Sequence, residues 1–408
     1  MVGSISPESS PPEASAFPLR VAIDAVSAAP GGGSSYLLHQ LPALERAGAQ
    51  LLVFARPEIV SQLATVLTGA AFIPVPLKST FRRMAYSNIR LPKEAASWGA
   101  HVLYCPGSTG PILGTLPQVI CIQNPNLFVL DAPRSLRLSL IRIITWWSAF
   151  RAAQLVHISQ TMADQFAVTS GLSCPTRVIY SGAGGLRSPA GVAVAASRTR
   201  PYILAVSNFY HYKRMDVVVR AYLEDDLLRG GYDLVIAGAE LESGITDHLL
   251  RLALVAHASD RVTLLGFVGA VELENLYRNA DAYVSASERE AFPLTPAEAL
   301  VAGTPVVLSD IPSFRELYRS WAIFARPGDP HDFALAIRRA LQAEVPPCQV
   351  DAVLRCFSWE RNAEALLDAL RAAQGGGIPS FDVSLRRIDV RRLNNVAATL
   401  FGHGTVPW

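Results

Sequence analysis

Charged residues, lysines, paired cysteines and long apolar runs are all scarce in this chain of 408 residues. Only 17% of the residues are charged and the formal net charge is +2, too little to attract nucleic acid in general. The five cysteines include no C-x-x-C pair, so we expect inert thiols in a reducing compartment and no metal site. No stretch reaches about 18 uncharged apolar residues, so we expect no transmembrane helix and a cytoplasmic location.

Half of the residues are hydrophobic, and the length suggests two domains. Residues 1–18 are rich in Ser and Pro and are predicted to be a disordered tail, not a signal peptide. Residues 186–200, rich in Gly, Ala and Ser, are predicted to link the domains. Residues 375–408 include a basic segment to which the sequence assigns no role.

Short apolar runs alternate with helical patterns on both sides of that linker. Leu19–Asp24 leads through the glycine-rich loop 29–35 into a helical pattern and then into a second β-type run, Leu51–Ala55. The alternation restarts at Tyr202–Val206 and continues to about residue 324. Strand–helix alternation forces parallel pairing, and ligands of parallel sheets bind at the carboxyl ends of the strands.

We therefore expect an α/β protein with two Rossmann-like domains, 19–185 and 201–355, whose parallel sheets face a central cleft. A terminal helix, 356–374, is expected to return toward the first domain.

The segment 287–300 carries the strongest chemical signal. It follows the strand candidate Ala282–Ser285, and Thr295, Pro296 and Glu298 fit the N-cap, N1 and N3 positions of a capping box. A helix that starts there would offer free N–H groups to a phosphate. From the residues alone, Glu298 could equally serve only as a cap, and Glu290 could be a solvated loop carboxylate.

A second polar segment, 206–214, follows the first strand of the second domain. Lys213, one of only three lysines, and Arg214 lie where this loop meets its helix. Two cations opposite a helix N-terminus would hold a diphosphate, although such a pair on a surface is usually only solvated.

Residues 20–370 resemble the glycosyltransferase family 4 group of retaining enzymes, which has the GT-B fold. The match rests on the two glutamates Glu290 and Glu298 with seven residues between them, and on the following run Ala302–Val307. Weaker similarities, convincing only in their order and spacing, lie at Gly31–Gly33, Ser159, Val178–Gly182, Lys213, Leu265–Val268 and Phe357–Glu360.

The resemblance implies a role for each matched residue. Glu290 would contact the transferred sugar, and Lys213 would neutralise the leaving diphosphate, so these two are the candidate catalytic residues. The donor-binding candidates are Gly32, Gly33, Asn208, Arg214, Gly266, Phe267, Leu294, Thr295 and Glu298. Because fixed cations and N–H groups can stabilise a leaving diphosphate, no metal or other cofactor is expected.

The chain departs from the family pattern at three places. Ser207 or Asn208 stands where an arginine is frequent, and Arg214 is a candidate substitute. Pro293 replaces a frequent glycine and removes one backbone donor. Asn124 stands where many members have histidine; it can position a hydroxyl but cannot act as a base, and it is the acceptor-side candidate.

The expected activity is transfer of a hexose-type sugar, mannose among the candidates, from a GDP-, UDP- or dTDP-sugar to a glycan or lipid-linked glycan of a surface polysaccharide. Residues 133–150 form an amphipathic pattern with two interpretations. The helix either packs its apolar face into the core or lies on an anionic membrane, which would place the enzyme at the inner face of the plasma membrane.

Two other functions stay open. A nucleotide-sugar epimerase or dehydrogenase would need G-x-G-x-x-G after an early strand, and Gly31–Gly33 lacks that spacing. A non-catalytic nucleotide-sugar-binding protein would use the same residues as the transferase, so only turnover separates the two.

Overall fold

The computed structural model describes residues 18–28, 32–127, 136–183 and 200–376. The expected tail at 1–18, the linker at 186–200 and the tail at 375–408 lie almost wholly outside these ranges. Gly31 and the start of the 133–150 segment lie outside them as well.

The first domain is built on a seven-stranded parallel sheet with the order β3-β2-β1-β4-β5-β6-β7. Its central strands are buried on both faces, which explains why they appear in the sequence as short unbroken apolar runs. The strands are β1 (Arg20–Ala25), β2 (Gln50–Ala55), β3 (Ala71–Pro74), β4 (Val102–Cys105), β5 (Gln118–Ile122), β6 (Gln154–His157) and β7 (Thr176–Val178). Helices on both faces connect them: α1 (Gly32–Arg46), α2 (Pro57–Leu63), α3 (Thr80–Ile89), α4 (Leu91–Trp98), α5 (Leu136–Arg151) and α6 (Gln160–Ser170).

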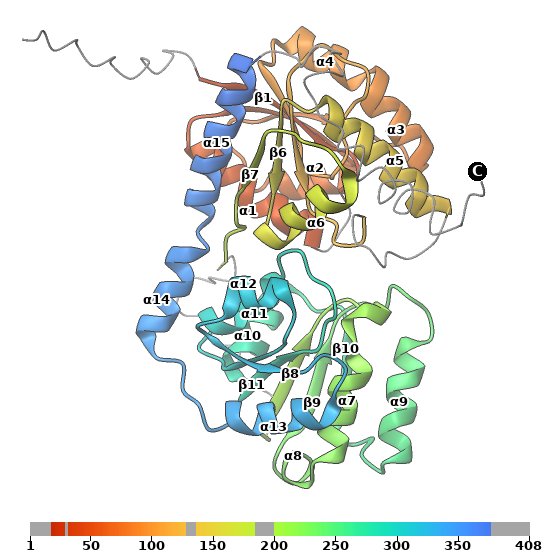
Figure 1. Ribbon diagram of the computed structural model, residues 1–408, viewed down its shortest axis with the longest axis vertical. Coiled ribbons are helices and arrows are strands. Elements are labelled where there is room, and N and C mark those ends of the chain that lie inside the picture. The colour runs from red at the N-terminus through yellow and green to blue at the C-terminus, as the bar shows by residue number, and fades with distance from the viewer. Residues whose placement is uncertain (1–17, 29–31, 128–135, 184–199, 377–408) are drawn as a thin grey trace, which may run out of the picture.

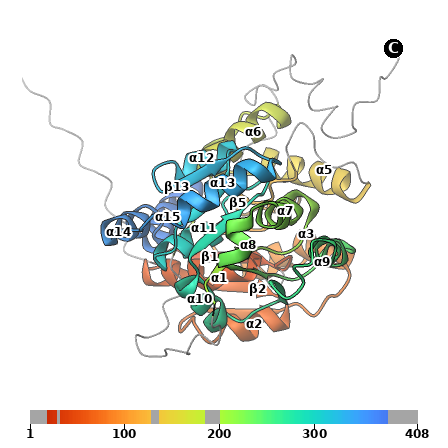
Figure 2. The same cartoon turned by 90° about the horizontal axis from the view of Figure 1, so that it is seen from below.

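The second domain repeats the plan with a six-stranded parallel sheet in the order β10-β9-β8-β11-β12-β13. The strands are β8 (Tyr202–Val206), β9 (Asp233–Ala237), β10 (Val262–Gly266), β11 (Ala282–Ser285), β12 (Val306–Ser309) and β13 (Ala322–Ala325). The connecting segments are η1 (His211–Lys213), α7 (Met215–Glu224), α8 (Asp226–Gly231), α9 (Ile245–Val255), α10 (Ala270–Asn279), α11 (Leu294–Val301), α12 (Pro312–Tyr318) and α13 (Pro330–Ala340). Helices α7, α9 and α13 lie on one side of this sheet, and α10 and α11 lie on the other (Figures 1 and 2).

Two such parallel-sheet domains constitute the GT-B fold, so the expected fold class is confirmed. The chain ends its described part with α14 (Pro347–Cys356) and α15 (Trp359–Gly376), and α15 runs up the side of the first domain against α1 (Figure 1). The Gln40 amide of α1 donates to the Asn362 carboxamide of α15 at 2.9 Å, and both side chains are buried.

The carboxyl ends of the two sheets face each other and are joined by hydrogen bonds. Glu316 of α12 accepts the backbone N–H groups of Gln160 (2.6 Å) and Thr161 (2.8 Å) at the start of α6, and the hydroxyl of Thr161 (2.6 Å). Tyr180 donates its hydroxyl to the same carboxylate at 3.0 Å. A carboxylate from the second domain therefore satisfies the N-terminal N–H groups of a helix in the first.

The burial of individual α5 residues bears on both interpretations of the 133–150 segment. Arg142, on the polar side of the amphipathic pattern, is buried and donates its Nε–H to the Leu127 carbonyl at 2.9 Å. Leu140 and Trp147 stay largely exposed, so part of the apolar face is not core. Within the described ranges, no helix is both long enough and apolar enough to cross a membrane.

Candidate active site

Two segments that are distant in sequence meet at the carboxyl edge of the second sheet. Lys213 ends η1 after β8, and Glu290 follows β11. Lys213 Nζ lies 2.7 Å from Glu290 Oε1, and the two side chains are 17% and 8% exposed. The structure thus brings the two candidate catalytic residues into a partly desolvated ion pair, which neither segment alone could predict.

The backbones of the two segments are tied together. Glu288 donates its N–H to the Tyr212 carbonyl at 2.9 Å, and the fully buried Ser287 hydroxyl donates to the same carbonyl at 3.4 Å. The ion pair is therefore held by a fixed frame and does not depend on two flexible loops meeting.

The start of α11 differs from the sequence prediction. The helix begins at Leu294, and its N-cap is Pro293, which makes no side-chain cap. Thr295 and Glu298 do not form a capping box. The Thr295 hydroxyl lies 2.7 Å from the Tyr283 hydroxyl, and Glu298 Oε2 accepts the Tyr277 hydroxyl at 3.0 Å. The prediction was wrong because two buried tyrosines, which local sequence cannot reveal, compete for both side chains.

This correction leaves Glu298 without the structural duty of a cap. Its carboxyl is half-buried, and burial raises its pKa to about 7 while the Tyr277 hydrogen bond lowers it. Leu294 and Thr295 are in the first turn of α11, where backbone N–H groups have no acceptor within the helix. Their role as phosphate donors stays a prediction.

Three buried tyrosines that the sequence did not single out support this segment. Tyr277 holds Glu298, Tyr283 holds Thr295, and Tyr318 donates to the Pro293 carbonyl at 2.6 Å. A buried tyrosine usually has a hydrogen-bond partner for its hydroxyl. Of these three, Tyr283 alone lies in an apolar strand run, which was the available signal in the sequence.

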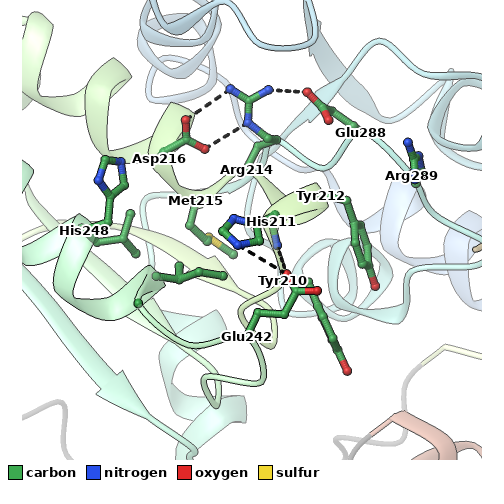
Figure 3. Close-up of a pocket in the computed structure, with 13 residues that line it drawn as sticks. Tyr210, His211, Tyr212, Arg214, Met215, Asp216, Glu242, His248, Glu288 and Arg289 are labelled. Atoms are coloured by element: carbon green, nitrogen blue, oxygen red, sulfur yellow. Dashed lines mark hydrogen bonds and ion pairs between the residues drawn. The ribbon is translucent and has the colours of Figure 1, made fainter. Parts of the chain in front are cut away.

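Arg214 is placed differently from Lys213. Its guanidinium donates to Asp216 at 3.0 Å and also bonds to Glu288, and these carboxylates raise its pKa (Figure 3). A diphosphate at Arg214 would have to compete with both carboxylates. Asn208 likewise has a partner, since its Oδ1 accepts the Ala239 N–H at 3.2 Å.

The segment with the donor-binding candidates Gly266 and Phe267 has an unusual backbone. Gly266 has φ +69°, and a Cβ there would strain the chain although no atom lies in its way. Phe267 beside it is 76% exposed, a large aromatic surface without cover. In the first domain, Gly32 opens α1, and a Cβ at Gly33 would meet no other atom within 4 Å. The role of both glycines in donor binding stays a prediction.

The acceptor-side candidate lies after β5. Asn124 is exposed, and its Oδ1 accepts the Asn126 N–H at 2.9 Å in a local turn. Burial raises the pKa of the Tyr212 hydroxyl, and the nearby Asn126 side chain of the first domain lowers it. The turn that carries Asn124 therefore lies close to the segment that carries Lys213.

Two titratable groups at the first-domain edge were not predicted as site residues. Asp24 is the last residue but one of β1, and burial raises its pKa to about 6; the Val26 N–H and the Ser87 hydroxyl donate to it, each at 3.3 Å. His157 ends β6, and burial lowers its pKa to about 4. Among the described residues, no group of three or more His, Cys, Asp or Glu is arranged to hold a metal ion.

Comparison with known protein families bears on this site directly. Residues 193–351 match the family model "Glycosyl transferases group 1". The matched part contains Lys213, Glu290 and Glu298, and it supports the expected group 1 family for the second domain.

Two curated relatives agree in class and differ in acceptor. The chain is 28% identical over 205 residues to the O-antigen chain mannosyltransferase RfbU of Salmonella typhimurium, covering 49% of this chain and 54% of that protein. It is 30% identical over 283 residues to a D-inositol 3-phosphate glycosyltransferase of Nocardia farcinica, covering 64% and 61%. The matches thus span about half to three fifths of each relative's length.

Solved structures share the fold across both domains. Sucrose-phosphate synthase from Thermosynechococcus elongatus superposes with a TM-score of 0.68 at 19% identity, over 86% of this chain and 98% of that one. The Anabaena protein HepE in complex with UDP-glucose gives 0.61 at 17% identity, over 88% and 98%.

Proposed function

We propose that this protein is a retaining glycosyltransferase that moves a hexose from a nucleotide diphosphate sugar to a glycan of a bacterial-type surface polysaccharide. The observation that carries the proposal is the Lys213–Glu290 ion pair at the carboxyl edge of the second sheet, within the part that matches the group 1 model. The mannosyltransferase RfbU among the relatives favours mannose as the hexose.

The proposed reaction breaks the bond between the anomeric carbon and the diphosphate oxygen. Negative charge builds on the leaving diphosphate, and Lys213, with the first N–H groups of α11, stabilises that charge. The acceptor hydroxyl attacks from the face that the diphosphate leaves, and its proton passes to the departing phosphate oxygen. Configuration is thereby retained, and the products are the glycosylated acceptor and the nucleoside diphosphate.

Each glutamate has a separate proposed task. Glu290 contacts hydroxyls of the transferred sugar and keeps Lys213 in position before the donor arrives. Glu298 accepts hydrogen bonds from the ribose hydroxyls, and the Tyr277 hydroxyl, which donates to its carboxylate, keeps it in position. The charge on the diphosphate is met by Lys213 and backbone N–H groups, so the proposed chemistry proceeds without a metal.

The proposed location is the cytoplasm, where nucleotide sugars are made, with contact to the inner face of the membrane. The largely exposed Leu140 and Trp147 of α5 support that contact.

A thermal-shift screen with GDP-, UDP-, dTDP- and ADP-sugars tests the donor assignment. A ligand at 100 times its dissociation constant should stabilise the fold by about 2.7 kcal/mol. If no nucleotide sugar shifts the melting temperature at millimolar concentration, the donor assignment is wrong. Slow hydrolysis of the stabilising donor without acceptor would separate an enzyme from a binding protein.

A further inference from the structure

A cavity of about 730 Å³ opens next to the loop segment that carries Lys213 (Figure 3). Its walls come from the 210–216 segment, the start of α9 and the Glu288–Arg289 turn. This volume is in the range of small-ligand sites. The donor contacts proposed above leave the cavity unused, because of the proposed donor residues only Arg214 lines it.

Two aromatic rings connect this cavity to the reaction centre. Lys213 Nζ lies 5.3 Å from the centre of the Tyr212 ring, and the Tyr212 and Tyr210 rings stack with centroids 5.4 Å apart at 18°. Both tyrosines line the cavity. Such flat rings offer large, rigid, apolar faces that suit the C–H faces of sugar rings, while their hydroxyls serve as hydrogen-bond partners.

Polar groups suited to hydroxyls lie next to the rings. Glu242 accepts the backbone N–H of His211 at 2.7 Å, and its side chain is still 42% exposed. The His211 imidazole is 80% exposed and lies 3.9 Å from the same carboxylate. A carboxylate and an imidazole, both accessible, can accept and donate hydrogen bonds to vicinal hydroxyls.

The electrostatics of the cavity disfavour a phosphate. Arg214 is neutralised by Asp216 and Glu288. The start of α9, which would otherwise attract an anion, is occupied by Glu240, which accepts the N–H groups of Ile245 (2.8 Å) and Thr246 (3.2 Å). With Glu242 and Arg289 added, the lining carries three carboxylates against two guanidinium groups, so it suits a neutral polyhydroxyl ligand better than a nucleotide.

We infer that this cavity is a subsite for a neutral oligosaccharide: the sugar units of the acceptor glycan beyond the one that is glycosylated. The inference rests on the proposed function for the identity of the reaction, and on the cavity itself for the ligand class. It assigns acceptor recognition partly to the second domain, with Tyr210 as the stacking platform and Glu242 and His211 as hydroxyl partners.

Binding of neutral trisaccharides tests the inference. Mannotriose, maltotriose, cellotriose and chitotriose would be titrated at millimolar concentration into the full chain, with ligand-observed NMR and calorimetry as readouts. At least one should bind the wild type, and Tyr210→Ala should weaken that binding about tenfold, as expected for loss of an aromatic anchor. His211→Ala, at an exposed position where misfolding is not expected, should weaken it severalfold. Leu227→Ala, exposed on α8 and outside the cavity, is the matched control and should change nothing.

Three outcomes would overturn the inference: no trisaccharide binds, binding is unchanged in both cavity variants, or a nucleotide sugar displaces the trisaccharide competitively. Failure of the proposed function looks different. In that case no nucleotide sugar would stabilise the wild type, while trisaccharide binding would still depend on Tyr210 and His211.

Discussion

At the carboxyl edge of the second sheet, charges are paired: Lys213 with Glu290, and Arg214 with Asp216 and Glu288. At the corresponding edge of the first sheet, Asp24 and His157 are buried without an ion pair to a described residue. Burial raises the pKa of Asp24 and lowers that of His157, so the neutral form of each group is favoured. Lys213 can exchange its one carboxylate partner for a phosphate without being left unpaired, whereas Arg214 already has two carboxylate partners. An edge with single, nearly neutral groups suits hydroxyls. The contrast therefore matches the proposed charged donor on the second domain and the reacting hydroxyl of a neutral acceptor on the first.

The largest expected effect comes from removing the cation of the paired edge. Lys213→Met keeps most of the side-chain length and should lower kcat/KM for transfer by about 100- to 1,000-fold, because the leaving diphosphate loses its fixed positive charge. Nucleotide-sugar affinity should fall as well. Steady-state kinetics and calorimetry measure both, and Lys93→Met, at an exposed position on α4, is the matched control. Full activity in Lys213→Met would show that the paired cation of the second sheet does not stabilise the leaving diphosphate.

Removing the anion of the same pair should separate catalysis from binding. Glu290→Gln should lower transfer by about 100-fold, because the sugar loses its charged contact near the anomeric carbon. Nucleotide affinity should stay equal or increase, because Lys213 no longer shares its charge with a carboxylate. Calorimetry with the nucleoside diphosphate measures the sign of this change in affinity. Equal loss of nucleotide binding in Lys213→Met and Glu290→Gln would contradict the separate roles.

The first-domain edge should respond to pH in stability. The pKa of Asp24 is raised from 3.8 in the unfolded chain to about 6 in the folded protein. The folded protein is therefore favoured while Asp24 is protonated, and its stability falls as the pH rises from about 4 to 6. The full cost above pH 6 corresponds to about 3 kcal/mol at most. Asp24→Asn should therefore raise the melting temperature at pH 8 and leave it nearly unchanged at pH 4. An equal change in melting temperature at both pH values would show that burial does not raise the pKa of the Asp24 carboxyl.

The smallest expected effect concerns Glu298. Its pKa of about 7 means that the carboxylate form, which accepts ribose hydroxyls, forms only as the pH rises through neutrality. Nucleotide-sugar affinity should therefore increase severalfold from pH 6 to pH 8, while the contribution of Glu298 to stability falls between about pH 4.5 and 7. Calorimetry with an intact nucleotide sugar, whose diphosphate diester does not titrate in this range, measures the change. Glu298→Gln should bind equally at both pH values; a slope that persists in this variant would assign the titration to another group.

Much of the second domain could be predicted because its site residues lie at strand ends that are visible as apolar runs. Ala282–Ser285 is both the expected and the observed strand, so Glu290 had to lie at the sheet edge. The prediction of a capping box at the start of α11 failed for a physical reason. Thr295 is hydrogen-bonded to Tyr283 in β11, and Glu298 is hydrogen-bonded to Tyr277 in α10. The first-domain strand β3, half-exposed and four residues long, carried too weak a pattern to be predicted.

The sequence by itself determined the two parallel sheets and the order in which polar segments leave their carboxyl ends, because apolar runs of strand length and helical periodicity are local properties. It also indicated Glu290 and Lys213 as separate candidates. Only the tertiary structure decided that these two form one ion pair, that Arg214 turns away to Asp216 and Glu288, and that Glu316 ties the domains together. The ion pair joins residues 77 positions apart, the Arg214–Glu288 contact joins residues 74 apart, and the Glu316 contact joins residues 156 apart; no local pattern records such contacts.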